Sequence, residues 1–397
     1  MCNFGKRKTN RNMKKTATLL FAAAVAAAAT QSCGSGGGTL SGLSPEAFDT
    51  TANGKKVQLF TLKNEAGMEV CITNYGARVV SLMANDNNNQ AVDVVLGHDN
   101  IAQYMDTASA ARDMGALVGR YSGLLAKGTA EIGGEKVSLE ANCGKNYVDG
   151  GRDGWQWRVF DAAQPDEKTL VLTIKAGDGE GGLPGNVDAK VTYTLTDDNA
   201  LECKVEATAD KATALNPAPH IYFNLMGNAA QPCTNMVMHI NADKFATVDT
   251  TLVPTGELRD VYGTPLDFTK RHALYESIAD TSFQQVKYAG GFNHYWCLNT
   301  YDGKAGNTSK VAASLYSQET GVYMEVFTNA PGLQAYTSNG FGAGVKGKGG
   351  VTYPKRSGVM IAPQQYPDAF NHKGFNPPVV KPGEKQTYLT TFKFSVK

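Results

Sequence analysis

The fold and chemistry of this chain are decided by the segment Asn216-Pro217-Ala218-Pro219-His220-Ile221-Tyr222-Phe223-Asn224-Leu225. It holds a single histidine, His220, within a run of residues suited to positioning its side chain. Two interpretations are open. His220 is either a buried structural residue of a strand or an acid–base group, because imidazole changes charge close to neutral pH.

Short segments that alternate apolar and polar residues surround this segment, and clusters of Gly, Asn and Asp separate them. Alternation interrupted by turns is typical of antiparallel strands. The predicted strands are 56–62, 69–73, 77–83, 170–176, 189–195, 201–207, 236–240, 322–328 and 388–395. Short helices are expected at 101–105 and 277–284, and no long stretch keeps a helical period. The predicted fold class is therefore all-β, a large antiparallel β-sandwich.

The length and composition of the chain limit how many domains and which kinds of partner are expected. The chain has 397 residues, a length that allows two average domains but also one large β-sandwich. No linker follows residue 42, so a single domain over 43–397 is expected. The net charge is +1 with 19% charged residues, which gives no electrostatic reason to expect a nucleic-acid partner.

The first 33 residues resemble an export signal rather than part of the fold. Lys14 and Lys15 precede an apolar run over 16–30, and small residues lead to Cys33. A glycine-rich tether over 34–42 follows, as in bacterial lipoproteins, where the cysteine is lipidated. We therefore expect an exported cell-envelope lipoprotein that meets the membrane only through this anchor. Ordinary secretion with a coincidental cysteine is the alternative.

Several further motifs follow one another in a fixed order along the chain. They are Asn74-Tyr75-Gly76-Ala77, Asp93-Val94-Val95-Leu96-Gly97, Gly115-Ala116-Leu117-Val118-Gly119-Arg120, Asp178-Gly179-Glu180-Gly181-Gly182-Leu183-Pro184-Gly185, Pro331-Gly332-Leu333-Gln334-Ala335-Tyr336 and Pro367-Asp368-Ala369-Phe370-Asn371. Together with the His220 segment, they resemble the aldose 1-epimerase (galactose mutarotase) family over nearly the whole chain after the tether. The resemblance implies a large twisted β-sandwich of the galactose mutarotase-like supersandwich type, with a sugar site on its concave face.

The resemblance also implies roles for single residues. Anomer interconversion needs a base for the anomeric hydroxyl and an acid for the ring oxygen. His220 matches the family's acid, and Gln334 matches a sugar-binding residue. The position of the family's glutamate base is Ala362. An arginine and a histidine that contact sugar in the family correspond to Leu124 and Asp149.

Replacements for the missing groups are expected among six residues. Asp149 is the candidate base, with His294 or Gln365 assisting, although an aspartate before two glycines is also typical of a solvated turn. Asn293 stands where the family has an aspartate and keeps hydrogen-bonding capacity. Trp155 and Trp296 follow the two altered motifs and are candidate stacking surfaces for a sugar, with core packing as the alternative.

Two functions of different classes follow. The first is a hexose-binding aldose 1-epimerase relative, an isomerase that interconverts anomers of galactose- or glucose-type sugars. The second is a non-catalytic surface protein that binds a monosaccharide or oligosaccharide for a glycan-uptake system. Loss of the carboxylate at Ala362 favours the second, and retention of His220 in its motif favours the first. Different sugar chemistry at the same site is a third, weaker alternative. No metal, phosphate or nucleotide motif occurs, so no metal ion or cofactor is expected.

Overall fold

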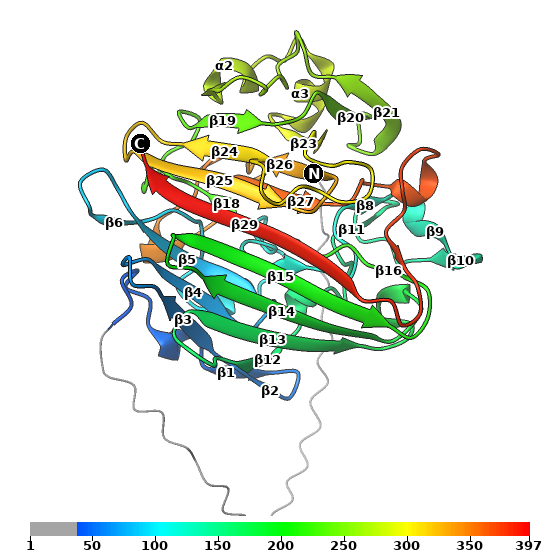
Figure 1. Ribbon diagram of the computed structural model, residues 1–397, viewed down its shortest axis with the longest axis horizontal. Coiled ribbons are helices and arrows are strands. Elements are labelled where there is room, and N and C mark those ends of the chain that lie inside the picture. The colour runs from blue at the N-terminus through cyan, green and yellow to red at the C-terminus, as the bar shows by residue number, and fades with distance from the viewer. Residues whose placement is uncertain (1–37, 343) are drawn as a thin grey trace, which may run out of the picture.

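Antiparallel strands are the main secondary structure of the computed structural model, which describes residues 38–342 and 344–397 (Figure 1). The predicted signal, Cys33 and the first part of the tether lie outside the described residues. Within those residues, no helix is both long enough and apolar enough to span a membrane.

The first layer is a nine-stranded sheet, at the front of Figure 1. In spatial order its strands are β12 (Asp161–Ala163), β13 (Thr169–Ala176), β14 (Val187–Leu195), β15 (Ala200–Ala209), β29 (Gln386–Val396), β25 (Val322–Thr328), β24 (Ala313–Tyr316), β19 (Val237–Ile240) and β22 (His272–Ala273). The C-terminal strand β29 lies between β15 and β25, pairing Ala200 with Lys393 and Val322 with Val396. The end of the chain therefore joins the two halves of this sheet.

The second layer contains a six-stranded and a four-stranded sheet. The six-stranded sheet consists of β18 (Tyr222–Phe223), β27 (Val359–Gln364), β26 (Gly332–Tyr336), β23 (Asn293–Cys297), β20 (Lys244–Val248) and β21 (Pro254–Asp260). The four-stranded sheet consists of β3 (Leu59–Lys63), β4 (Glu69–Thr73), β5 (Arg78–Asn85) and β6 (Ala91–Asp93). Two antiparallel layers around one core form a β-sandwich, as the sequence predicted.

Two-stranded pairs and short helices complete the described part of the fold. The pairs are β1 (Thr50–Ala52) with β2 (Lys55–Val57), β7 (Leu117–Val118) with β17 (Ala218–Pro219), β8 (Leu124–Leu125) with β11 (Tyr147–Val148), β9 (Thr129–Ile132) with β10 (Glu135–Ser138), and β16 (Thr213–Ala214) with β28 (Val379–Val380). The helices are α1 (Ile101–Tyr104), α2 (Tyr275–Ile278) and α3 (Gln284–Ala289), with 3₁₀ turns at Pro45–Phe48, Ala126–Gly128, Trp155–Trp157, Glu180–Gly182, Lys348–Gly350 and Ala369–Asn371.

The predicted strands all fall on observed strands, and the helix expected at 101–105 is α1. The ranges 69–73 and 322–328 coincide with β4 and β25. The helix expected at 277–284 was wrong, because two short helices, α2 and α3, flank a turn there. In that turn the Asp280 carboxylate accepts a hydrogen bond from the Ser282 backbone N–H (3.0 Å), which competes with a helical hydrogen-bonding pattern.

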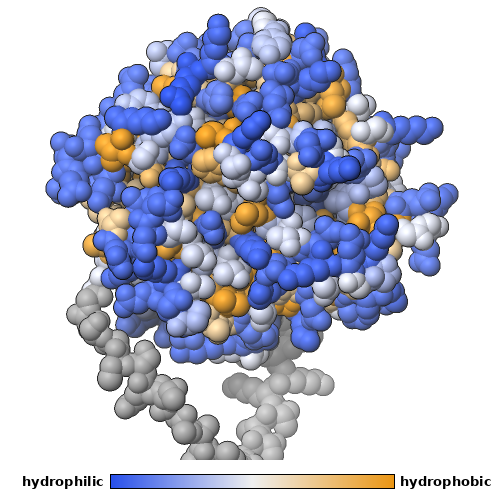
Figure 2. Space-filling model, viewed as in Figure 1, coloured by the Kyte–Doolittle hydropathy of each residue, from blue (hydrophilic) through white to orange (hydrophobic). Residues whose placement is uncertain are grey.

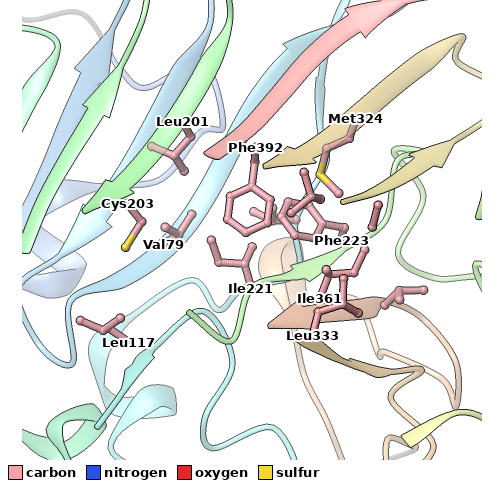
Figure 3. Packing of buried hydrophobic residues seen from close by; sticks show 14 of the residues in the cluster. Val79, Leu117, Leu201, Cys203, Ile221, Phe223, Met324, Leu333, Ile361 and Phe392 are labelled. Carbon is pink, nitrogen blue, oxygen red and sulfur yellow. The ribbon is translucent and has the colours of Figure 1, made fainter. Parts of the chain in front are cut away.

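Apolar side chains of both layers meet between the sheets (Figure 3). Leu201 and Phe392 come from the nine-stranded sheet, while Phe223, Leu333 and Ile361 come from the six-stranded sheet; all five are fully buried. The outward face of the nine-stranded sheet is mostly hydrophilic, with separate apolar residues (Figure 2). On β14, buried and more exposed residues alternate from Val187 to Leu195, which is the period expected of a strand with one face in the core.

Candidate active site

Strand alternation decides which residues face away from the core. Ile221, Leu333 and Ile361 belong to the core between the layers (Figure 3). Successive side chains of a strand point to opposite faces. Their neighbours Gln334 and Ala362 therefore lie on the other face of the second layer. His220, between β17 and β18, is connected to the same face through Ser122, which bonds Gln364 two residues after Ala362. Ala362 and Gln334 are directly paired across β27 and β26.

The backbone of His220 is held by the segment that leads into β7. Its N–H donates to the Ala116 carbonyl (2.8 Å), and its own carbonyl accepts from the Gly115 N–H (2.9 Å). A side chain at Gly115 is excluded, because a Cβ there would lie 2.1 Å from the Val79 carbonyl oxygen and φ is +75°. The close approach of these segments fixes the position of His220, whose relative exposure is only 5%.

A chain of two hydrogen bonds runs from the His220 ring. Ser122 Oγ lies 3.0 Å from His220 Nε2 and donates to Gln364 Oε1 at 2.9 Å. Serine has one hydroxyl proton, and an amide oxygen only accepts. Because that proton goes to Gln364, the Ser122 oxygen accepts from His220, so Nε2 carries a proton. All three side chains are buried.

Asn216, the first residue of the deciding segment, ties the strands around this chain together. Its side-chain Nδ2 donates to the Ser122 carbonyl (2.8 Å), and its Oδ1 accepts from the Gln365 backbone N–H (2.9 Å). Asn216 therefore links the Ser122 segment to the end of β27. This contact accounts for the placement of Ser122 against Gln364, two residues that are 242 positions apart in sequence.

Asp149 lies at the same site, in a turn after β11. Its φ is +50°, and one carboxylate oxygen accepts from the Gly123 backbone N–H (2.8 Å). Its own backbone N–H donates to the Gly123 carbonyl (3.0 Å). Asp149 is therefore a turn residue that lies near the site. The sequence had left open whether it was one or the other.

The described structure adds a second carboxylate, Asp113, which the sequence analysis did not consider. It precedes Gly115, and its Oδ2 lies 3.3 Å from Arg112 Nε. Burial raises the pKa of Asp113, the Arg112 guanidinium opposes that rise, and the Asp149 carboxylate and His220 also act on it. Asp113, Asp149 and His220 are therefore close enough to interact electrostatically. The adjacent charges of Arg112-Asp113 beside the Gly115–Arg120 motif were the available signal.

Gln334 and Asn293 form a polar pair on the same face. Gln334 Nε2 donates to Asn293 Oδ1 (2.7 Å), and both side chains are half-buried. Tyr336 follows on β26, is half-buried, and packs edge-on against Tyr222 with ring centroids 6.1 Å apart. These residues offer amide groups and an aromatic ring beside His220, the combination that sugar hydroxyls and C–H faces require.

Three residues expected at the site lie in the core instead. Trp155, Trp296 and His294 are each 0% exposed, so neither indole presents a face to a sugar and His294 cannot assist a base there. Trp296 Nε1 donates to the Leu266 carbonyl (3.0 Å), and burial lowers the pKa of His294 to about 4. The Trp155 ring packs on Gly119, where a Cβ would lie 2.4 Å from the indole. The two predicted tryptophan contacts are corrected to core packing.

Arg120, the last residue of the motif Gly115–Arg120, also has a structural role. Its guanidinium donates to the Gly185 carbonyl at 3.0 and 2.6 Å, joining the motif Gly115–Arg120 to the turn that ends at Gly185. This is a structural contact. Among residues 38–342 and 344–397, no group of three or more His, Cys, Asp or Glu side chains is arranged to hold a metal ion.

Comparisons with known proteins place this geometry in context. The family model for aldose 1-epimerase matches residues 58–393. The chain is 34% identical to galactose mutarotase of Bos taurus over 340 residues, which is 86% of this chain and 94% of that protein. It is 32% identical to aldose 1-epimerase of Escherichia coli K12, over 86% of this chain and 96% of that protein.

Solved structures agree with this result. A GalM/aldose epimerase homologue from C. elegans superposes with a TM-score of 0.77 at 26% identity, covering 86% of this chain and 99% of that one. Galactose 1-epimerase from Lactobacillus acidophilus NCFM gives a TM-score of 0.75 at 28% identity, covering 87% and 97%.

Proposed function

Because this chain belongs to the aldose 1-epimerase family, we propose that it binds a free hexose of the galactose or glucose type and interconverts its α and β anomers. The observation that carries the proposal is the fixed position of His220, whose Nε2 lies 3.0 Å from Ser122 Oγ in a buried chain that ends at Gln364, near two carboxylates. An imidazole held at a fixed position can act as a general acid.

The reaction needs no redox step or added group. His220 gives its proton to the ring oxygen while a carboxylate takes the proton of the anomeric hydroxyl, and the bond between C1 and the ring oxygen breaks. Rotation about the C1–C2 bond presents the other face of the aldehyde. Reversal of the two proton transfers then closes the ring as the other anomer. Gln334, Asn293 and Tyr336 bind the rest of the sugar.

Polarimetry tests this function. Freshly dissolved α-galactose and α-glucose are followed with the protein and with a buffer blank. We expect acceleration above the blank, and we expect it to fall at least 100-fold in His220→Gln, which keeps an amide donor but cannot transfer a proton. His239→Gln, at a half-buried histidine of β19, is the matched control. Unchanged activity in His220→Gln would remove the acid assignment.

A second candidate function is sugar binding without catalysis, and one observation favours it. The methyl group of Ala362 is fully buried opposite Gln334, where a carboxylate is expected from the family resemblance. Calorimetric titration with galactose and with oligosaccharides separates the two. Binding without any acceleration in polarimetry would support the non-catalytic protein that captures glycans for uptake.

For location, we propose export and lipid anchoring at Cys33. The support is the sequence alone: the lysine pair, the apolar run and the glycine-rich tether. Metabolic labelling with a radioactive fatty acid should mark the protein, and Cys33→Ala should abolish the label. Cys2→Ala, at the other N-terminal cysteine, is the control and should keep it.

A further inference from the structure

Asp113 occupies the turn that holds the backbone of His220. The Ala116 N–H donates to the Asp113 carbonyl (3.1 Å), and the neighbouring Gly115 and Ala116 make both backbone hydrogen bonds to His220. Arg78 fixes this turn from the other side, because its buried guanidinium donates to the Met114 carbonyl (2.9 Å). The position of Asp113 relative to His220 is therefore set by backbone contacts.

The carboxyl group of Asp113 is incompletely satisfied. Its side chain is 14% exposed, and Oδ2 pairs with Arg112. Oδ1 is buried and has no hydrogen-bond partner among the described residues. Buried polar atoms are nearly always hydrogen-bonded, and an exception at a site calls for a donor from a ligand or water. A sugar hydroxyl is such a donor.

The surroundings of Asp113 also suit proton transfer. Burial raises its pKa, Arg112 lowers it, Asp149 raises it, and His220 and Arg78 lower it. The net direction is upward from the ordinary value of an aspartate. A carboxylate whose pKa is raised is a stronger base than an exposed one, and catalysis is most effective when the pKa approaches the working pH.

Asp149 is the less suitable of the two carboxylates. One of its oxygens already accepts from the Gly123 N–H, and its left-handed backbone makes it part of the turn. Protonating or moving it would disturb that turn. Its negative charge instead adds to the effect of burial, which is the main cause of the raised pKa of Asp113.

Resting on the epimerase function proposed above, we infer that Asp113 is the general base of this site, with Asp149 as a positioning residue. Asp113 takes the proton from the anomeric oxygen as His220 protonates the ring oxygen and the C1–O bond breaks. On closure, protonated Asp113 returns a proton to the aldehyde oxygen while His220 takes one from the attacking hydroxyl. Both residues end in their starting protonation states. The base has thus moved from the Ala362 position on β27 to the turn before β7.

Polarimetry over a pH series tests the assignment in the full-length protein. Asp113→Asn keeps the shape of the side chain and removes the basic oxygen. We expect kcat to fall about 100- to 10,000-fold, KM to change little, and the acid limb of the pH profile to disappear. Asp106→Asn, at an exposed aspartate just upstream, is the matched control and should keep wild-type rates. Asp113→Glu should recover part of the activity, which an amide cannot.

A second variant tests the inference independently, in case Asp113→Asn does not fold. Arg112→Gln removes the charge that lowers the pKa of Asp113, so the acid limb of the profile should move to higher pH. Wild-type kinetics and an unchanged acid limb in Asp113→Asn, or an unmoved limb in Arg112→Gln, would overturn the inference while the epimerase function stands. Absence of acceleration by the wild-type protein would overturn both.

Discussion

Ser122→Ala is the perturbation that tests the core of the proposed site, because the Ser122 hydroxyl is shared by two buried partners. It accepts from His220 Nε2 at 3.0 Å and donates to Gln364 Oε1 at 2.9 Å. Alanine removes the hydroxyl without creating a large cavity. Two buried polar groups then lose their partner at once.

The size of the stability loss follows from how deeply these two groups are buried. A buried donor or acceptor left unsatisfied costs about 1–3 kcal/mol. Ser122 is 0% exposed, while His220 and Gln364 are 5% and 4% exposed, so bulk water replaces the lost bonds poorly. The serine hydroxyl itself no longer has to be desolvated, which offsets part of the loss. We expect the free energy of unfolding to fall by about 2 kcal/mol.

Urea denaturation measures this change. The midpoint should move to lower urea with an unchanged slope, since the exposed surface on unfolding is the same. Ser138→Ala, at an exposed serine of β10, is the control and should stay within about 0.5 kcal/mol of the wild type. A loss below about 0.5 kcal/mol in Ser122→Ala would refute the shared hydroxyl and, with it, the assignment of the proton to Nε2.

Three further predictions concern neighbouring features. Asp149→Ala should lower stability by about 1 kcal/mol in urea denaturation, because it loses the Gly123 contact and alanine disfavours a φ of +50°, whereas Asp149→Asn should change it by only a few tenths. Burial lowers the pKa of His98 and His294 from 6.5 to about 4. The unfolded chain therefore binds protons that the folded chain does not, so the melting temperature should fall as pH drops from about 6.5 to about 4, and His294→Gln should flatten this dependence. Trp296→Phe should lower stability by about 1–3 kcal/mol while hexose affinity in calorimetry stays unchanged; a tenfold loss of affinity would restore the sugar-contact interpretation.

The strands were predictable because their burial follows a two-residue period that the sequence displays directly. On β14 and β15 every second residue is apolar and enters the core. The same rule could have corrected Trp296. Asn293 and Trp296 are three positions apart on β23, so in a regular strand they point to opposite faces and cannot both contact a sugar.

The closest contacts of the site were not predictable from one sequence. Ser122 meets Gln364 only because Asn216 links two segments that are far apart along the chain. The burial of Trp155 depends on its packing against the backbone of Gly119, and no local pattern signals that contact. Asp113 gains its character from burial and from the charges of Arg112 and Asp149, which are properties of the folded chain.

The location of the two carboxylates explains how such a site could change its chemistry without changing its fold. Gln334 is held by strand pairing and His220 by backbone hydrogen bonds to Gly115 and Ala116. Their neighbours Leu333 and Ile221 belong to the core, so substitutions there affect packing on the opposite face. Asp113 and Asp149 lie in turns, where a new side chain disturbs few core contacts. At Ala362 the sheet position is enclosed by packing, so a carboxylate would have to be buried there. Asp113 is also buried, but its carboxyl group lies beside the Arg112 guanidinium, which offsets part of the desolvation cost. Its turn is hydrogen-bonded to the His220 backbone, so a base supplied from this turn still approaches His220.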